Sequence, residues 1–509
     1  MIETQNIIIL GGGSAGWMTA STLINRYPEK NITVIESPTT PVTGVGESTI
    51  GQFNDWLTMV GIEDEDFMPH TDASYKLSIK FTDFYKKGES FHYPFGSIYP
   101  VDLSFGHRNW FYKENKSNDG YANFLWPQMA LVNNNTITTN DDNLIPNFTL
   151  KRDTAYHFDA IQFATWLREN YCKPRGVNHI VEDITDIKVD DNGIVSLNNY
   201  EADLYFDCTG FKSVLMEKLN VKFNSYNDLL PNNKAWATRV PYTDKEKELE
   251  PYTNCTAIEN GWVWNIPTWE RIGTGYVYSD KYISDEEALD EFKRHLDSKD
   301  LDYSQSEFKN IPMRIGLHED IFVKNVCAIG LSAGFIEPLE SNGLLTVHEF
   351  LTYLIYVMDR NDKLSSLDVL SFNSECKSFF NQYADFVATH FSLSHRDDTK
   401  YWQDISKRDW SKVTKSTKLG MLDTIDVFMK NWAYYNIEFG VHAISTGMNY
   451  HGCSALHIKQ QLQMEKHFPW SQVYDENKRR DELVEEWDAI GKAQPSLLTF
   501  VSKIHENKQ

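Results

Sequence analysis

Three absences limit what this 509-residue chain can be. Its six cysteines are scattered, and no two have the Cys-x-x-Cys spacing of a zinc or redox site. Basic residues are few, 49 against 72 acidic ones, and the formal charge of -23 argues against nucleic acid or an anionic membrane as the main partner. No apolar run has the length and flanks of a membrane span or a signal peptide. We therefore expect a cytoplasmic protein with no disulfide framework and no metal site, whose ligands are small molecules.

Material for a core is abundant. Hydrophobic residues make up 41% of the chain and aromatic residues 14%, enough at this length for one large core or two to three smaller ones. The pattern predicts strands at 6–10, 32–35, 180–197, 202–206 and 326–329, helices at 17–27 and 159–169, and mostly helix from 344 to about 450. DDNG at 190–193 is a candidate hairpin turn, 71–132 reads as short irregular pieces, and 133–147 as a surface loop. There is no internal repeat.

The first chemical motif is GGGSAG at 11–16, which follows a predicted strand and precedes a predicted helix. In this context Gly-x-Gly-x-x-Gly lets the backbone approach a pyrophosphate, and the positive end of the helix meets its charge. Glu36 ends the second strand about twenty residues later, where its carboxylate can accept hydrogen bonds from a ribose. The sequence therefore predicts a dinucleotide site, with a tight structural turn as the alternative.

Two later segments bear on whether that dinucleotide is NAD or FAD. DLYFDCTGF at 203–211 and VCAIGLSAGF at 326–335 are strands that end in small residues. They resemble the second and third FAD contacts of flavoproteins with two dinucleotide folds, whereas a simple NAD domain needs neither. Taken singly, each segment is better explained by an ordinary buried strand followed by a glycine turn.

Seven segments then resemble one family. GGGSAGWM, GVGES, YKLSIKF, YHFDA, GWVWNIP, GTGYVYS and FIEPLESNG occur in the order found in flavin-dependent tryptophan halogenases, and they span nearly the whole chain. GWVWNIP at 261–267 is the most specific of them. In the family this segment lies beside the flavin and keeps the organic substrate away from it, which would make Trp262, Trp264, Ile266 and Pro267 shielding residues. By itself, the pair of tryptophans is explained equally well by core packing.

The resemblance implies the chemistry of a halogenase. Reduced FAD and oxygen would oxidise a halide to hypohalous acid, and Lys76 would hold the oxidised halogen over an aromatic ring, by a hydrogen bond or as a haloamine. Burial suits a lysine to this task because it lowers the pKa of the amine. Glu340 would orient the electrophile or accept the ring proton. Without the family, Lys76 reads as a surface lysine and Glu340 as a carboxylate at a helix start.

The resemblance also assigns the remaining contacts. The FAD residues would be Gly11, Gly13, Ser14, Ala15, Gly16, Glu36, Val45, Gly46, Glu47, Gly330, Leu331 and Leu344. Backbone amides of Asn342 and Gly343 would bind the halide. Asn342 departs from the family's usual threonine, which leaves the preferred halide open, and a looser site would favour bromide and iodide, the more easily oxidised halides.

The substrate residues implied are Tyr93, Phe95, Ser341 and Trp432, where Tyr93 and Phe95 provide an aromatic slot. The residues that grip the ammonium and carboxylate of tryptophan in relatives fall here on Val427, Glu438 and Phe439, and those anchors are absent. A site built to pair charged groups discriminates strongly through them. We therefore expect indoles, phenols or larger aromatic compounds as substrates, and free tryptophan as a poor one.

The predicted fold is a mixed α/β architecture. An FAD-binding body with two dinucleotide folds would cover 1–345, with substrate-site segments at 71–150 and 212–310, and a mostly helical region at 346–509 would cover the substrate. No NADPH motif is evident, so reduced FAD is expected from a separate flavin reductase that binds transiently; the oligomeric state is left open. Two rival functions remain, an FAD-dependent aromatic monooxygenase and a non-catalytic flavin- or ligand-binding protein.

Overall fold

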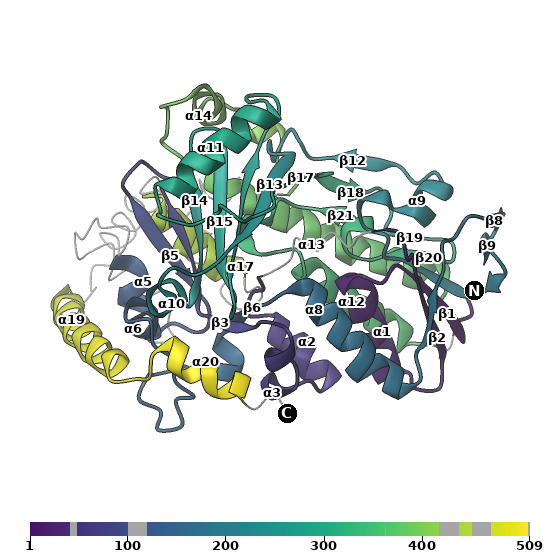
Figure 1. The fold of residues 1–509 in the computed structure, drawn as a ribbon, viewed down its shortest axis with the longest axis horizontal. Helices are drawn as coiled ribbons and strands as arrows, with labels where there is room; N and C mark the ends of the chain where they lie inside the picture. The colour runs from purple at the N-terminus through teal and green to yellow at the C-terminus, as the bar shows by residue number, and fades with distance from the viewer. Residues whose placement is uncertain (41–47, 100–119, 362, 417–436, 450–469, 507–509) are drawn as a thin grey trace.

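The computed structural model describes residues 1–40, 48–99, 120–361, 363–416, 437–449 and 470–506. Two main sheets, one of six strands and one of seven, organise this part of the chain (Figure 1). The six-stranded sheet lies on the right of Figure 1, near the N-terminus, and the seven-stranded sheet lies on the left beneath α11 (Asp285–Asp297). The architecture is therefore mixed α/β, as the sequence predicts.

The six-stranded sheet contains the N-terminal strand. Its spatial order is β19 (Phe322–Val323), β20 (Val326–Ala328), β11 (Leu204–Asp207), β1 (Asn6–Leu10), β2 (Asn31–Glu36) and β7 (Asn178–Val181). β19 is antiparallel to β20, and all other neighbours are parallel. Ile7, Ile9 and Val34 are buried, as expected for parallel strands covered on both faces. The predicted strands at 6–10, 32–35, 202–206 and 326–329 are confirmed, and all four lie in this sheet.

Helix α1 (Ser14–Arg26) follows β1 and packs against α12 (Leu345–Met358). It begins three residues before the predicted start at Trp17, because the glycine loop already forms its first turn. The Trp17 N–H donates to the Gly13 carbonyl at 3.0 Å. The expected strand, helix and strand at the start of the chain are therefore present, with the glycine loop between β1 and α1.

The seven-stranded sheet was largely missed from sequence. Its order is β17 (Lys309–Pro312), β13 (Lys234–Val240), β16 (Ile272–Tyr278), β15 (Gly261–Pro267), β14 (Tyr252–Ala257), β4 (Ser78–Thr82) and β5 (Ser90–Pro94). β4 runs parallel to β14, and the other pairs are antiparallel. The prediction that 71–132 forms only irregular pieces is wrong, because β4 and β5 extend a sheet whose other strands come from much later in the chain.

Three smaller sheets are also present among the described residues. They are β3 (Ser74–Lys76) with β6 (Ala155–His157); β10 (Tyr200–Glu201), β9 (Gly193–Leu197) and β8 (Ile187–Asp190); and β12 (Phe223–Ser225), β18 (Gly316–His318) and β21 (Gly334–Phe335). The predicted DDNG turn joins β8 to β9. The predicted helix at 159–169 is α8 (Ala160–Trp166), which continues as a π-helical segment, Leu167–Cys172.

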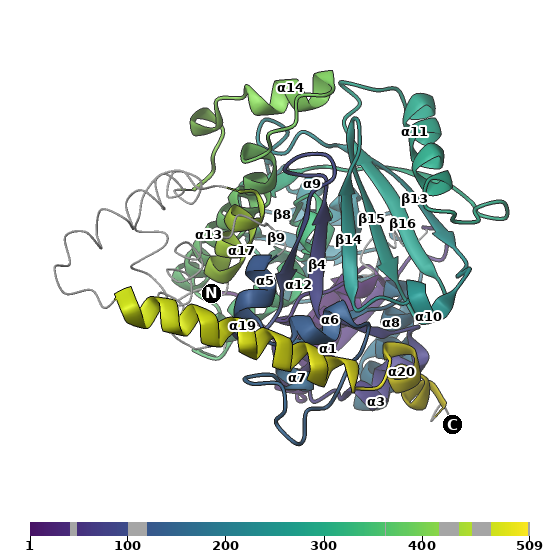
Figure 2. The ribbon, with the colours of Figure 1, turned by 90° about the vertical axis from the view of Figure 1, so that its left-hand side faces the viewer.

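The C-terminal part is mostly helical, as predicted. Its described helices are α12, α13 (Ser366–Ser392), α14 (Lys400–Ser406), α17 (Ile437–Gly447), α19 (Trp470–Lys492) and α20 (Leu497–Glu506). Figure 2 shows α19 crossing the front of the molecule and α20 below it. The Phe500 ring on α20 lies 6.0 Å from the Tyr75 ring on β3, so the last helix packs on the strand that carries Lys76.

Shorter helices fill the remaining connections. They are α2 (Phe53–Val60), α3 (Asp64–Phe67), α5 (Gly120–Leu125), α6 (Met129–Asn133), α7 (Leu150–Asp153), α9 (Val214–Lys218) and α10 (Lys245–Glu248). One buried cluster contains residues of β1, α1, α12 and α13 together, so the N-terminal sheet and the C-terminal helices share a core. None of the helices in the described ranges is long and apolar enough to cross a membrane.

Candidate active site

A cavity of about 600 Å³ lies at the carboxyl ends of β1, β2 and β11. Nucleotides bind at this edge in open parallel sheets. The predicted cofactor residues that line the cavity are Gly11, Gly13, Ser14, Ala15, Glu36, Gly330, Leu331 and Leu344. Val45, Gly46 and Glu47 lie outside the described residues. The two late strand ends predicted to face a flavin therefore meet the glycine loop around one cavity.

Close backbone packing explains two of the glycines. A Cβ atom on Gly11, which has φ +120°, would lie 2.2 Å from the Cys208 carbonyl oxygen. A Cβ atom on Gly16 would lie 1.9 Å from the Gly11 carbonyl oxygen. Gly16 is not among the described residues that line the cavity, which differs from its prediction as a cofactor contact. Because Gly16 has no side chain, α1 can pack closely against the loop.

The polar groups around this cavity fit a flavin dinucleotide. The first residue before α1, Gly13, has no side chain to cap the helix, and the first turn carries no acidic residue. The positive end of α1 is therefore open to a pyrophosphate. Glu36 is held at the cavity edge by Arg168, 3.2 Å from its carboxylate, and by His179 at 2.9 Å. Both contacts keep an acceptor in place for a ribose hydroxyl.

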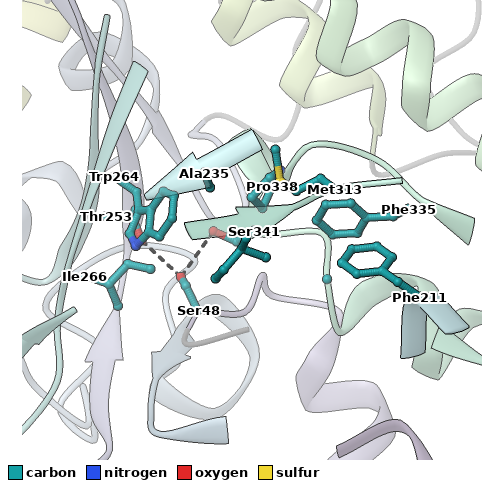
Figure 3. A pocket seen from close by; sticks show the side chains of 12 residues that line it. Ser48, Phe211, Ala235, Thr253, Trp264, Ile266, Met313, Phe335, Pro338 and Ser341 are labelled. Atoms are coloured by element: carbon teal, nitrogen blue, oxygen red, sulfur yellow. Dashed lines mark hydrogen bonds between the residues drawn. The ribbon is translucent and has the colours of Figure 1, made fainter. Parts of the chain in front are cut away.

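A second cavity, of about 30 Å³, adjoins the first (Figure 3). Its lining residues are Ser48, Phe211, Ala235, Thr253, Trp264, Ile266, Ile311, Met313, Phe335, Pro338, Ser341 and Gly343. Phe211, Phe335 and Gly343 line both cavities, and the two phenylalanine rings stand edge to face at 5.4 Å. Figure 3 shows this ring pair on the right, with the hydroxyls of Ser48 and Ser341 between it and the side chains on the left, which are Trp264, Thr253 and Ile266. The small cavity thus leads from the nucleotide cavity toward a group of hydroxyls.

The Lys76 amine is hydrogen-bonded to both of those hydroxyls. Its Nζ donates to Ser48 Oγ at 2.9 Å, to the Thr49 carbonyl oxygen at 2.9 Å and to Ser341 Oγ at 2.8 Å. The side chain is fully buried, at 0% exposure. The three N–H bonds of an ammonium are all satisfied, which is what allows a lysine to be buried without an ion pair.

The electrostatic surroundings of Lys76 shift its titration. Burial lowers the pKa of Lys76 from 10.5 to about 7, and the Cys255 thiol and the Glu340 carboxylate act in the opposite direction. The Phe95 ring, a predicted substrate contact, lies 5.1 Å from Nζ. An amine with this pKa gains and loses a proton readily near neutral pH.

Glu340 lies on the 3₁₀ turn Pro338–Glu340, one residue before Ser341. Its Oε1 atom is 2.8 Å from Nε2 of His390, near the end of α13, and both side chains are 0% exposed. Burial raises the pKa of Glu340, while His390 and Lys76 oppose the shift. The structure therefore brings both predicted catalytic residues into one buried group, together with a histidine that the sequence did not single out.

The four residues predicted to shield the flavin lie in three different environments. Trp264 and Ile266 line the small cavity. The Trp262 ring lies 6.2 Å from that of Trp264 but is completely buried, and its Nε1 donates to Glu337 at 2.8 Å. Pro267 contributes its carbonyl oxygen, which accepts from Ser74 Oγ at 3.1 Å. Trp262 and Pro267 do not belong to the described lining of either cavity, so any shielding by them is indirect.

The predicted halide contacts follow Glu340. Ser341 has φ +54°, and this left-handed turn directs the chain from Glu340 into Asn342 and Gly343. The side-chain amide of Asn342 donates to the Ile336 carbonyl at 3.2 Å, and its Oδ1 is buried without a partner among the described residues. Gly343 lines both cavities, and a Cβ atom there would meet open space.

The predicted substrate residues are only partly described. Tyr93 and Phe95 lie at the end of β5, with ring centroids 6.0 Å apart and nearly perpendicular. Burial raises the pKa of the Tyr93 hydroxyl, and Glu340 adds to this shift. Trp432 and Val427 lie outside the described residues, as do the side chains of Glu438 and Phe439. The two rings predicted to form an aromatic slot therefore lie side by side, with Phe95 beside Lys76, while their role in substrate binding and the loss of the amino-acid anchors stay predictions.

Several site residues had no predicted role. Ser48, His157, Phe211, Phe335 and Glu337 stand inside the motifs that were recognised, so adjacency to a motif was the available signal. Thr253 and His390 had no signal, because a threonine in a strand and a histidine in a helix are common core residues. Among the described residues, no group of three or more histidine, cysteine, aspartate or glutamate side chains could hold a metal.

Comparison with known proteins identifies the family. Residues 6–449 match the family model described as tryptophan halogenase. The chain is 34% identical to tryptophan 6-halogenase SttH of Streptomyces toxytricini over 80% of this chain and 82% of that protein. It is 32% identical to tryptophan 7-halogenase RebH of Lentzea aerocolonigenes over 85% and 83% of the two chains.

Solved structures agree along the full length. The apo structure of VirX1 superposes with a TM-score of 0.88 and 35% identity over 99% of both chains. The crystal structure of SttH superposes with a TM-score of 0.83 and 29% identity over 98% of this chain and 99% of that one. The chain belongs to the tryptophan halogenase family, and its enzyme class is that of a flavin-dependent halogenase.

Proposed function

We propose that the protein uses reduced FAD, oxygen and a halide to halogenate an aromatic substrate, with Lys76 as the residue that delivers the oxidised halogen. The observation that carries the proposal is the position of Lys76. Its amine is fully buried and bonded to two of the hydroxyls that line the small cavity, which adjoins the nucleotide cavity. FAD, held by the glycine loop and Glu36, would supply the oxidation of halide to hypohalous acid.

The backbone after Glu340 would hold the halide. The N–H groups of Asn342 and Gly343 have no acceptor among the described residues, and Gly343 lines both cavities. Free N–H groups in a confined space bind a small anion well. Because these donors belong to the backbone, the asparagine at 342 preserves them. We propose that the site accepts bromide and iodide at least as well as chloride.

Lys76 and Glu340 would share the proton transfers of electrophilic substitution. Hypohalous acid would bind at the Lys76 ammonium, whose Nζ lies 5.1 Å from the centre of the Phe95 ring. The aromatic π electrons form the new carbon–halogen bond, the oxygen–halogen bond breaks, and the oxygen leaves as water with a proton from Lys76. The ring proton passes to the Glu340 carboxylate, whose raised pKa favours accepting it. Return of that proton to Lys76 closes the cycle.

The substrate is proposed to be an indole, a phenol or a larger aromatic compound. SttH and RebH are named for halogenation of tryptophan. In this chain the positions aligned with their amino-acid grip are Val427, Glu438 and Phe439, which offer fewer partners for an ammonium and a carboxylate. We also propose cytoplasmic action with reduced FAD supplied by a separate reductase.

One reaction tests the proposal. The protein is incubated with a flavin reductase, NADH, FAD, bromide and a panel of indoles, phenols and free tryptophan, and products are analysed by mass spectrometry. The isotope pair of bromine in an indole or phenol product is the expected result. Products that carry oxygen with no halogen would support a monooxygenase, and no product with any halide would support a binding protein. Efficient turnover of free tryptophan would overturn the substrate assignment, and a clear chloride preference in a three-halide competition would overturn the halide assignment.

A further inference from the structure

A buried series of hydrogen bonds runs from Lys76 through Ser48 and Thr253, which line the small cavity, to His157. Ser48 Oγ, which accepts from Lys76, lies 3.0 Å from Thr253 Oγ1, and Thr253 Oγ1 lies 2.9 Å from Nε2 of His157. Nδ1 of His157 lies 3.1 Å from the Pro267 carbonyl oxygen. Figure 3 shows the contacts that Ser48 makes with Thr253 and Ser341. His157 and Thr253 belong to two different strands, β6 and β14, and both side chains are buried.

The donor and the acceptor of every hydrogen bond in this series follow from its last partner, the Pro267 carbonyl oxygen. A carbonyl oxygen only accepts, so Nδ1 of His157 carries the hydrogen. Burial, with the charge of Lys76, lowers the pKa of His157 well below its ordinary value, so the ring is neutral and Nε2 accepts. The Thr253 hydroxyl must then donate to His157, and the Ser48 hydroxyl must donate to Thr253.

The same reasoning extends to the third partner of Lys76. Ser341 Oγ accepts from Lys76 and donates to Ser48 Oγ at 3.1 Å. The Thr49 carbonyl can only accept. All three groups around Nζ therefore present lone pairs to it, and no hydroxyl hydrogen is left to point at the amine. Such an arrangement suits an ammonium, which has three hydrogens and no lone pair, and disfavours a neutral amine.

We propose, given the halogenase function above, that His157 and Thr253 are positioning residues that orient the hydroxyls around Lys76 and so hold it as an ammonium against the Ser48 and Ser341 side of the small cavity. Neither touches Nζ; both act through Ser48. An ammonium has no lone pair with which to form a haloamine, so in this state Lys76 acts on the oxidised halogen species as a hydrogen-bond donor, in exchange for one of its three acceptors.

Other groups also face Lys76 and affect its pKa independently of this series of hydrogen bonds. Glu340, from the turn after the small cavity, and Cys255, from β14, both raise the pKa of Lys76. Phe95 presents its ring from the end of β5. A variant of the chain must therefore leave these groups in place, and replacement of Thr253 by the isosteric valine does so.

The decisive experiment is the pH profile of bromination in matched variants. Thr253→Val removes the hydroxyl that keeps Ser48 oriented, so the Ser48 hydrogen becomes free to point at Nζ. Thr253→Ser restores the hydroxyl, and Thr256→Val removes a buried hydroxyl three residues along the same strand. In the profile of kcat against pH, we expect the falling limb to move about one pH unit lower in Thr253→Val. A pKa shift of this size corresponds to the free energy of one hydrogen bond to a charged group. The limb should stay in place in Thr253→Ser and Thr256→Val, with KM for the aromatic substrate little changed.

Two further variants guard the test against misfolding. His157→Leu removes the acceptor at the end of the chain and should reproduce the shift, whereas His157→Gln keeps a side-chain carbonyl and should restore much of the profile. An unchanged limb in both Thr253→Val and His157→Leu would overturn the proposal. Equal shifts in Thr256→Val would also overturn it, because they would indicate a general effect on stability.

Failure of the halogenase proposal can be told apart from failure of this one. If the unmodified protein brominates nothing, the same variants are titrated as free proteins labelled with ¹³C at the lysine ε-carbons. The Lys76 signal is the one missing in Lys76→Met. A lower titration midpoint in Thr253→Val than in Thr256→Val supports the oriented chain without any reference to catalysis, and identical midpoints would refute it.

Discussion

Oε1 of Glu340 and Nε2 of His390 lie 2.8 Å apart, and neither side chain is exposed to solvent. The turn that carries Glu340 also carries Ser341, a ligand of the Lys76 ammonium. A carboxylate in this position can accept a proton released beside Lys76, and His390 on α13 limits the directions in which it can point.

Replacement of Glu340 by glutamine should therefore slow halogenation by about 10²-fold, the usual contribution of a general base, with FAD binding unchanged. Initial rates of product formation and FAD fluorescence quenching would measure the two effects. Glu291→Gln is the matched control, because Glu291 is also a buried glutamate but lies on α11. A Glu340→Gln rate within threefold of the unmodified protein would exclude the proton-accepting role.

The rate should fall as pH rises through about 7. Burial lowers the pKa of Lys76 to about 7, and the proposed mechanism uses the ammonium to donate a proton to the departing oxygen. Below this pH the ammonium is populated, and above it the neutral amine replaces it. The measurement is kcat for bromination between pH 5.5 and 9 with reduced FAD in excess. A rate that instead rises through this range would favour the neutral amine as the working form.

Glu337 makes a prediction about stability. It is fully buried, bonded to Trp262 and Asn232, and burial raises its pKa from 4.5 to about 7. Between these two values the unfolded chain is ionised at Glu337 while the folded chain keeps the proton. The folded state then binds more protons, so the contribution of Glu337 to stability is complete below about pH 4.5 and is lost as pH rises toward 7.

Glu337→Gln removes this dependence, because glutamine does not titrate. The free energy of unfolding of the unmodified protein, relative to the variant, should fall by about 3 kcal/mol from pH 4.5 to 7. Urea unfolding of both proteins at several pH values measures the difference. Parallel curves for the two proteins would mean that Glu337 is ionised in the fold.

Gly16→Ala should weaken FAD binding strongly while most of the fold is retained. Its Cβ atom would lie 1.9 Å from the Gly11 carbonyl oxygen, so α1 must move away from the loop. We expect the Kd for FAD to rise by about 10²-fold or more, since the helix end and the loop must act together. Gly51→Ala is the control, because the nearest atom to its Cβ would be 3.8 Å away. Equal FAD affinity in both variants would contradict this account of the loop.

The parts of the fold predicted from sequence are those with local signals. β1, the glycine loop and β2 lie within the first 36 residues, and the hydrophobic runs and glycines of this segment determine them directly. β4 and β5 were missed because β4 pairs with β14, far along the chain, and because the aromatic residues around them weaken the alternation of a half-buried strand.

The candidate site was also predicted only where its residues lie in recognisable motifs. Lys76 and Glu340 were found through motifs, and the structure brings them together. Thr253 was not found, because its neighbours Ser48 and His157 are 205 and 96 residues away in sequence. GWVWNIP was found as a family motif and not as a strand, and the motif does not distinguish Trp264 at the cavity from Trp262 against Glu337.

Lys76→Met tests most directly whether one buried amine receives the halogen. Methionine fits the buried volume but has no hydrogen to donate. The measurement is brominated aromatic product per reduced FAD consumed, alongside FAD binding and hypobromous acid caught by a scavenger in solution. We expect normal FAD binding, continued formation of hypobromous acid and loss of aromatic product by about 10³-fold or more. Aromatic bromination at more than a tenth of the normal yield, on the usual ring position, would contradict it.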